Sequence, residues 1–333
     1  MPLLDVRDLA THFFTRQGRL PAVDGVSFAI EAGETVALVG ESGCGKSVTA
    51  ASILRLVPDP PGRFVGGEIR FEGRDLLKLP ADEMRALRGN RIGMVFQEPM
   101  TSLNPVFTIG DQIAEVIREH QKLSRAAAYA RVAELLNLVR IPDPHRLIRD
   151  YPHRLSGGMR QRAMIAMAIA CEPALLIADE PTTALDVTTQ AQILELLDDL
   201  KQRLGMAMLL ITHDLGVVAQ TAQRVLIMYA GRVVEEASVN DLFDEPLHPY
   251  TRGLLQSLPR PNAEVDAAGR PRPLLEIPGT VPSLAALPAG CRFAPRCPYA
   301  LDACRHGDLP LRLFSGGRAA ACVRAGDLHW AAP

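Results

Sequence analysis

The sequence has few aromatic residues, no long apolar run and no excess of charge of either sign. Aromatic residues make up 5% of its 333 residues, and 36 lysines and arginines nearly balance 38 aspartates and glutamates. This balance argues against the global basic field of a nucleic-acid-binding protein. No apolar run reaches the roughly 18 residues of a membrane span, and residues 1–14 do not resemble a signal peptide. We therefore expect a cytosolic protein or one peripheral to a membrane.

Cysteine is also scarce, and its six copies are unevenly distributed. Four of them lie close together near the end of the chain, at Cys291, Cys297, Cys304 and Cys322. In a cytosolic protein this grouping favours metal ligation over disulfide bonds. Eleven of the 26 prolines lie after Ser257. The composition therefore predicts a first domain over residues 1–257 and a loop-rich extension over residues 258–333.

A glycine-rich loop follows an apolar stretch near the start of the chain. Residues 35–39 form a continuous apolar run, as expected of a strand that is buried on both faces. Residues 40–47 then have the pattern GxxxxGK[ST], followed by a predicted helix that runs to about residue 56. In this strand–loop–helix context the pattern predicts a phosphate-binding loop. Lys46 is expected to reach the outer phosphates, and the Ser47 hydroxyl to coordinate Mg²⁺.

Three more predicted strands end in polar side chains. The strand at residues 174–178 leads into Asp179 and Glu180, and those at 206–212 and 91–96 lead into His213 and Gln97. Because the carboxyl ends of parallel strands share one edge of a sheet, we expect these side chains near the phosphate-binding loop. Asp179 is expected to bind the metal directly or through water, and Glu180 to polarise a water beside the terminal phosphate.

A Ser-Gly-Gly sequence precedes an apolar helix within residues 155–170. Ser156, Gly157 and Gly158 leave unpaired N–H groups at a helix N-terminus, where the helix dipole also favours an anion. A capped core helix is the alternative interpretation. Because residues 40–47 already supply a phosphate site, an anion at Ser156 would be a second one.

Together these segments resemble the ATP-binding-cassette (ABC) ATPases, over about residues 3–257 and in the family's order. A phosphate-binding loop alone would also fit kinases and GTPases, but the signature followed by Walker B at this spacing is very specific. The matching segments are Walker A at 40–47, the Q-loop at Gln97, the signature at 155–161, Walker B at 174–179, the catalytic Glu180, the D-loop at 184–186 and the switch His213.

The resemblance implies an α/β P-loop NTPase fold with an N-terminal antiparallel β subdomain and a helical subdomain at about residues 98–170. It also implies ATP hydrolysis in a dimer, with adenine stacked on Phe13 or Phe14 and Mg²⁺ held by Ser47, Gln97 and Asp179. Residues expected at the chain's own ATP are Phe13, Gly40, Ser42, Gly43, Cys44, Gly45, Lys46, Ser47 and Val48. Residues expected at the partner's ATP are Ser156, Gly157, Gly158 and Asp186.

Further segments are similar to the ATPases of dipeptide and oligopeptide importers and their nickel-importing relatives. They lie at residues 97–105, 179–187, 248–255 and 277–282. This narrower resemblance implies peptide uptake, with nickel or another small solute as the alternative and a non-transport ABC ATPase less favoured. The implied partners are a second ATPase, identical or paralogous, two membrane permeases and an extracytoplasmic binding protein. The implied location is the cytoplasmic face of the cell membrane.

The spacing of the four late cysteines does not by itself select a metal. It lacks the CxxC pairs usual in structural zinc sites and the common ferredoxin spacings. The segment 290–297, however, resembles the cysteine motif of these importer ATPases. The resemblance implies a 4Fe-4S cluster on Cys291, Cys297, Cys304 and Cys322, with zinc as the alternative.

Overall fold

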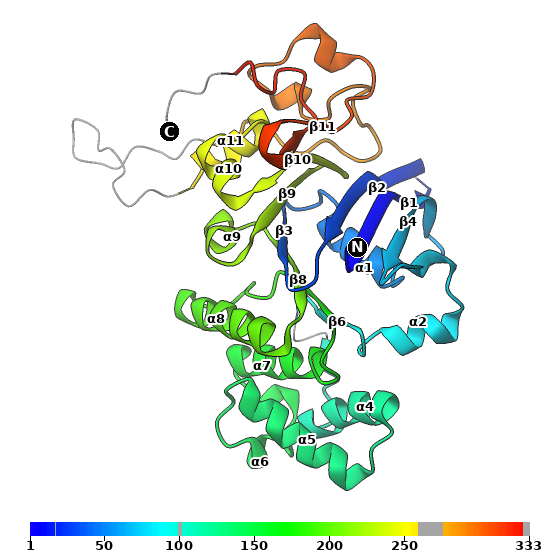
Figure 1. Ribbon diagram of the computed structural model, residues 1–333, viewed down its shortest axis with the longest axis vertical. Helices are drawn as coiled ribbons and strands as arrows, with labels where there is room; N and C mark the ends of the chain where they lie inside the picture. Colours follow the sequence, from blue (N-terminus) through cyan, green and yellow to red (C-terminus); the bar gives the residue numbers. More distant parts are fainter. Residues whose placement is uncertain (17, 99–101, 259–275, 329–333) are drawn as a thin grey trace, which may run out of the picture.

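The computed structural model describes residues 1–16, 18–98, 102–258 and 276–328. Two sheets form its centre (Figure 1): an eight-stranded sheet in the order β11-β12-β10-β9-β3-β8-β7-β6 and a four-stranded sheet in the order β2-β1-β4-β5. The strands of the larger sheet are β3 (Thr35–Val39), β6 (Ile92–Val95), β7 (Leu175–Asp179), β8 (Ala207–Thr212), β9 (Arg224–Tyr229), β10 (Arg232–Ser238), β11 (Arg312–Leu313) and β12 (Ala319–Ala320).

The parallel strands β9, β3, β8, β7 and β6 bring their carboxyl ends to one edge of the larger sheet. Strands β3, β7 and β8 are buried along their whole length, which explains their continuous apolar sequences. Alternate residues of β7 belong to two different hydrophobic clusters, with Leu176 on the side of the helical region and Leu175 on the side of the antiparallel sheet. The register of the sheet aligns Val39 of β3 with Thr212 of β8, and Asp179 of β7 with Ile211 of β8.

The N-terminal antiparallel subdomain is confirmed. It contains β1 (Leu4–Thr15), β2 (Gly18–Ile30), β4 (Gly62–Phe71) and β5 (Arg74–Asp75). Strand β2 begins at Gly18. Its first half contains Gly18, Pro21 and Asp24, which have low β-propensity, but backbone pairing with β1 still holds this half in the sheet.

The predicted helical subdomain is also confirmed, and it lies below the sheets in Figure 1. Each of its three longer helices begins after a side chain that accepts a hydrogen bond from the first turn. The cap of α4 is Thr108, whose side chain accepts a hydrogen bond from Asp111 N. The helices are α4 (Ile109–Gln121), α5 (Arg125–Leu138), α6 (Pro144–Leu147) and α7 (Gly157–Ala168).

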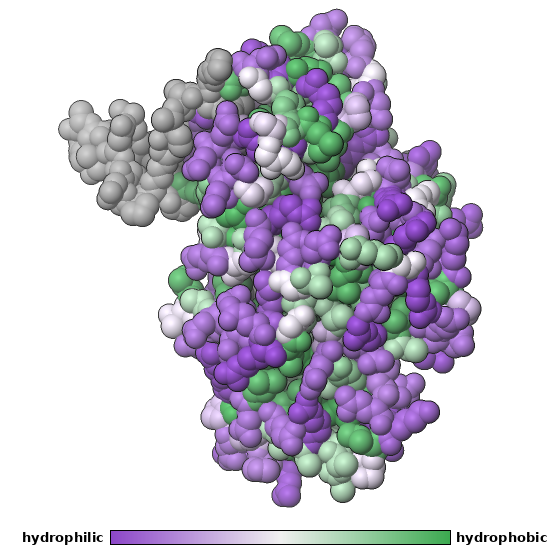
Figure 2. All heavy atoms as spheres, viewed as in Figure 1, coloured by the Kyte–Doolittle hydropathy of each residue, from purple (hydrophilic) through white to green (hydrophobic). Residues whose placement is uncertain are grey.

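The other helices flank the sheets, and polar residues cover most of the surface in view (Figure 2). No helix among the described residues is long and apolar enough to cross a membrane. The helices that flank the sheets are α1 (Lys46–Ile53), α2 (Ala81–Leu87), α8 (Val187–Leu204), α9 (Leu215–Thr221), α10 (Val239–Asp244) and α11 (Pro249–Gln256).

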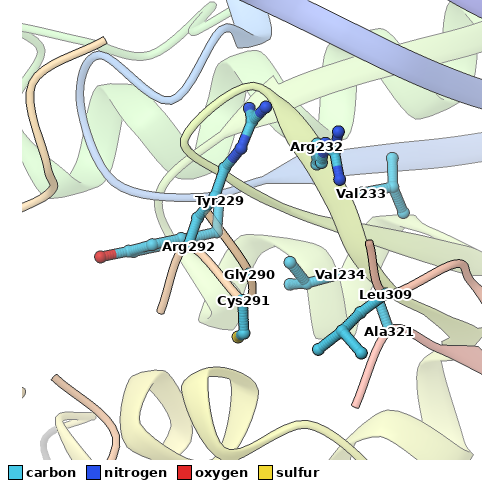
Figure 3. Close-up of a pocket in the computed structure, with 9 residues that line it drawn as sticks. All are labelled: Tyr229, Arg232, Val233, Val234, Gly290, Cys291, Arg292, Leu309 and Ala321. Carbon is cyan, nitrogen blue, oxygen red and sulfur yellow. The ribbon is translucent and has the colours of Figure 1, made fainter. Parts of the chain in front are cut away.

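The described part of the extension packs against the larger sheet. Its strand β12 pairs with β10, and β11 pairs with β12. Phe293 is buried against Tyr229 and Tyr250 of the first domain, with ring centroids 5.3 Å from each. Figure 3 shows Cys291 and Arg292 of the extension beside Tyr229 and β10. The extension thus shares a core with the first domain, and the boundary after Ser257 remains a sequence prediction.

Candidate functional site

The loop of residues 40–47 connects β3 to α1 and passes close to the backbone of its neighbours. A Cβ atom on Gly40 would lie 2.2 Å from the carbonyl oxygen of Met228, and one on Gly45 would lie 2.2 Å from that of Ala22. Gly45 also has a positive φ of 105°, which side chains disfavour. Only glycine fits at these two positions, so the loop can follow its tight path around the N-terminus of α1.

The side chain of Lys46 lies back across this loop. Its Nζ donates hydrogen bonds to the carbonyl oxygens of Gly40, at 2.8 Å, and Glu41, at 3.1 Å. The ammonium group is therefore held at the loop by main-chain oxygens. An anion bound there would meet this positive charge together with the N–H groups at the start of α1.

A hydroxyl and a buried carboxylate meet beside the loop. Ser47 Oγ donates to Asp179 Oδ1 at 3.1 Å. Burial raises the pKa of Asp179, and the neighbouring Glu180 raises it further, whereas the Ser47 hydrogen bond lowers it. A hydroxyl and a carboxylate are oxygen ligands of the kind that Mg²⁺ prefers, so a divalent cation fits this pair and would favour the ionised form of Asp179.

Glu180 directly follows β7, and its side chain contacts Gln97 and His213, which follow β6 and β8. Its side chain accepts hydrogen bonds from Gln97 Nε2 at 3.0 Å and Thr183 Oγ1 at 2.9 Å. His213 Nδ1 lies 3.5 Å from Glu180 Oε1, and the His213 side chain is 65% exposed. Glu180 has a positive φ of 46°, and its N–H donates to the carbonyl oxygen of Ile211 at 2.9 Å. Such a fixed carboxylate can accept a proton from a nearby water.

One pocket contains much of the predicted ATP site. It also includes Leu20, Ala22 and Leu284, which are not among the residues predicted from the sequence. No motif singles out any of these three residues, and Leu284 comes from the extension. The residues that line the pocket are Phe13, Leu20, Ala22, Ser42, Gly43, Gly45, Lys46, Ser47, Val48, Gln97, Glu180 and Leu284.

The structure places the two candidate adenine-stacking residues differently. Phe13 lines the pocket, whereas Phe14 is 47% exposed and lies under the guanidinium of Arg63. Consecutive strand residues point to opposite faces, which explains the difference. Cys44 belongs to the same loop, but its side chain is buried in the core. A contact from Cys44 to a nucleotide would therefore come from its main chain.

The Ser-Gly-Gly sequence lies outside that pocket. Ser156 caps α7 by accepting a hydrogen bond from Met159 N at 3.3 Å, and both Ser156 and Gly157 are exposed. Asp186 caps the neighbouring helix α8 and accepts from Thr189 N at 3.0 Å. A Cβ on Gly158 would lie 2.9 Å from the Thr189 methyl group. The beginnings of α7 and α8 therefore adjoin and present these predicted residues on the outside of the chain.

The four late cysteines interact but do not form a recognisable single-ion site. Burial raises the pKa of Cys297 to about 11, and the three other thiols add to this shift. The N–H groups of Leu301 and Arg324 donate to the sulfurs of Cys304 and Cys322, each at 3.4 Å. Among the residues that the structure describes, no group of three or more His, Cys, Asp or Glu could hold a metal ion. The predicted cluster is thus unsupported by the side-chain arrangement.

Two family models match the chain. Residues 23–183 match the model described as ABC transporter, and residues 234–304 match the model described as the C-terminal region of oligopeptide/dipeptide transporters. The second match begins within β10 and covers both following helices and the first three late cysteines, so it spans the predicted boundary at Ser257.

The chain is also similar to curated proteins along nearly its whole length. It is 58% identical to a probable peptide ABC transporter ATP-binding protein, y4tR, of Sinorhizobium fredii, over 98% of this chain and 96% of that one. It is 53% identical to the oligopeptide transport ATP-binding protein AppD of Bacillus subtilis, over 96% of each chain.

Solved structures show the same fold over most of the chain. The ATP-binding cassette MJ0796, dimeric and bound to ADP and Pi, has a TM-score of 0.64 at 28% identity, covering 71% of this chain and 98% of that one. CbiO1 of Clostridium perfringens, described as part of a transporter complex, has a TM-score of 0.61 at 26% identity, covering 73% and 90%.

Proposed function

The chain belongs to the ABC transporter ATPases, and from this premise we propose that it powers the import of di- and oligopeptides across the cytoplasmic membrane. The observation that carries the peptide assignment is the match of residues 234–304 to the C-terminal region of oligopeptide/dipeptide transporters. The relatives named above, which are described as peptide transport ATP-binding proteins, support the same assignment.

In this proposal the chain binds the ATP phosphates on the loop of residues 40–47. Main-chain N–H groups of the loop and the Lys46 ammonium neutralise the phosphates, and Phe13 contacts the adenine. The pocket that joins Phe13 to Lys46 supports this orientation. The residues proposed to contact the nucleotide are Phe13, Gly40, Ser42, Gly43, Cys44, Gly45, Lys46, Ser47 and Val48.

We further propose that Ser47, Asp179 and Gln97 hold Mg²⁺. The hydrogen bond between Ser47 and Asp179 supports the first two assignments, because it places two oxygen ligands side by side. Gln97 Nε2 donates to Glu180, so its amide oxygen remains available as an acceptor. Bound Mg²⁺ would offset the negative charge of the phosphates during transfer.

Glu180 is the proposed base for hydrolysis. Its carboxylate orients the attacking water and accepts a proton from it, while Lys46 and His213 interact with the terminal phosphate. Two features support these roles: the hydrogen bonds that fix Glu180 and the position of His213 beside it. Gln97 and Thr183 would hold the carboxylate in place until the nucleotide binds.

A second ATPase subunit, identical or paralogous, would complete the site. The exposed surface of Ser156, Gly157, Gly158 and Asp186 is proposed to face the partner's ATP. The dimeric form of the cassette MJ0796 supports pairing of this kind. We propose that the helical subdomain transmits closure of the pair to two permeases, which receive substrate from an extracytoplasmic binding protein. The chain would then lie peripherally on the cytoplasmic face of the membrane.

We also propose that Cys291, Cys297, Cys304 and Cys322 hold a 4Fe-4S cluster. The assignment rests on the resemblance of residues 290–297 to the cysteine motif of these importer ATPases, and not on the arrangement of the side chains. The cluster would cross-link loops that have little core of their own.

Purification without oxygen should therefore yield a coloured protein with equal amounts of iron and acid-labile sulfide. Cys297→Ser is expected to lose both, because one ligand is removed, and to show reduced thermal stability. Cys171→Ser, which removes a thiol in the turn after α7, serves as the control and should retain both. Zinc without iron in the wild-type protein would contradict the cluster assignment.

Deleting the gene is expected to abolish uptake of labelled di- and oligopeptides by the host cell. Re-expression of the wild-type chain should restore uptake, whereas Lys46→Ala should not, because its phosphate site lacks the ammonium group. Uptake of radioactive nickel is measured in the same strains. Loss of nickel uptake with unchanged peptide uptake would overturn the peptide assignment but leave the ATPase assignment intact.

A further inference from the structure

Arg296 of the extension forms a partly buried ion pair with Glu41 of the phosphate-binding loop. Its Nη1 lies 2.7 Å from Glu41 Oε2, and its Nη2 lies 3.0 Å from Glu41 Oε1. The Arg296 side chain is only 7% exposed. This bidentate geometry is the strong, directional form of an arginine–carboxylate contact. It joins residues that are 255 positions apart in the sequence.

Glu41 lies within the loop and is connected to its key lysine. Its carbonyl oxygen accepts a hydrogen bond from Lys46 Nζ at 3.1 Å, and its N–H donates to the hydroxyl of Tyr250 at 3.0 Å. The next residue, Ser42, lines the pocket. Glu41 therefore carries a negative charge in a loop whose ligand is a polyanion. Without a cation beside it, this carboxylate would repel the phosphates.

The position of Arg296 is fixed independently of Glu41. Its Nε donates to the carbonyl oxygen of Pro278 at 2.9 Å, and its Nη2 donates to that of Ile277 at 3.3 Å. The guanidinium also lies over the rings of Tyr229 and Phe293, 5.8 and 5.9 Å from their centroids. Because these contacts hold the guanidinium in place, it can act as an anchor for the loop.

The same segment of the extension reaches the nucleotide pocket directly. Leu284 lies between Pro278 and Arg296 in sequence and lines the pocket together with Phe13 and Lys46. The extension therefore contacts the site at two places: through Leu284 at the pocket wall and through Arg296 at the loop.

We propose that Arg296 is a positioning residue for the chain's own ATP site. Its guanidinium neutralises the charge of Glu41 and fixes the position of the phosphate-binding loop. The extension therefore contributes to ATP binding by this chain. The inference rests on the proposed function, because it concerns the same ATP site. It adds a role for the extension that does not depend on metal binding.

The test compares the affinity of purified full-length variants for MgATP by calorimetry, together with KM and kcat. Arg296→Gln is expected to weaken binding about tenfold, as for loss of a charged hydrogen-bonded partner. KM should rise with little change in kcat, because the catalytic groups remain. Adding Glu41→Gln to Arg296→Gln should restore most of the affinity, because the uncompensated carboxylate is then removed.

Arg292→Gln is the matched control. Arg292 is also an arginine of the extension whose side chain is only 9% exposed, but it pairs with Asp24 rather than with the phosphate-binding loop. This variant should lose stability without losing affinity for MgATP, and adding Glu41→Gln to it should restore nothing.

Failure of Glu41→Gln to restore binding in the Arg296→Gln protein would overturn the inference and leave Arg296 a purely structural residue. If Arg296→Gln does not fold, the affinity of the single variant Glu41→Gln tests the inference instead. This variant should bind MgATP at least about twofold more tightly than the wild-type protein at low salt, because a negative charge near the phosphates is removed. Unchanged affinity in that variant would overturn the inference. Absence of MgATP binding by the wild-type protein would instead contradict the proposed function.

Discussion

Glu180→Gln will lower the rate of ATP hydrolysis by on the order of a hundredfold or more, while MgATP binding stays close to wild type. The amide keeps the shape of the side chain but cannot accept a proton from water. Lys46, Ser47 and Asp179, which we assign to the phosphates and Mg²⁺, are unchanged. Steady-state phosphate release and calorimetric titration with MgATP measure the two effects separately.

The Glu180→Gln protein should also accumulate as an ATP-bound pair of cassettes. We propose that hydrolysis reopens the pair, so blocking it should hold two chains together on size-exclusion chromatography in MgATP. The control is Glu172→Gln, because Glu172 is another glutamate with positive φ and pairs with Arg131 outside the site. That variant should hydrolyse ATP normally. Wild-type turnover by Glu180→Gln would refute the catalytic assignment.

Ser156→Arg will remove hydrolysis almost completely without weakening the binding of MgATP to the same chain. The longer cationic side chain would fill the exposed N-terminus of α7, where we place the partner's phosphates. The chain's own pocket is lined by other residues, so a monomer should bind nucleotide normally. Nucleotide affinity is measured on dilute protein, and hydrolysis at concentrations at which pairs form.

Ser124→Arg provides a matched control for this variant. Ser124 caps α5 through a hydrogen bond from Ala127 N at 3.3 Å, as Ser156 caps α7 at the same distance. Both variants lose a helix cap at a cost of about 1 kcal/mol, but only Ser156 lies on the proposed pairing surface. Loss of nucleotide binding by the Ser156→Arg monomer would show that Ser156 serves its own ATP site.

The sequence predicted the catalytic edge of the sheet well because its signals are local. An apolar run followed by a polar residue marks the end of each buried strand, and parallel strands must end at the same edge. Gln97, Glu180 and His213 were placed together on this basis, and the structure brings them within hydrogen-bonding or ion-pair distance. Their chemical roles remain predictions.

The contacts that sequence could not predict join distant segments. Arg296 and Glu41 each look like an ordinary charged residue, and only the folded chain places one against the other. Leu284 likewise lies in a proline-rich stretch with no periodic pattern, yet it lines the ATP pocket. The positive φ of Glu180 also has no sequence signal, because a glutamate rarely adopts this conformation.

The central claim is that each ATP is hydrolysed between two chains, and mixing two inactive variants tests it most directly. Lys46→Ala lacks the ammonium group of the phosphate-binding loop and so has no working ATP site of its own. Ser156→Arg blocks the surface that the chain is proposed to present to its partner's ATP. A mixed pair keeps one complete site, formed by the loop of the Ser156→Arg chain and the Ser156 surface of the Lys46→Ala chain. We predict that mixing restores hydrolysis that neither variant shows alone. If mixed pairs form and remain inactive, the claim is wrong.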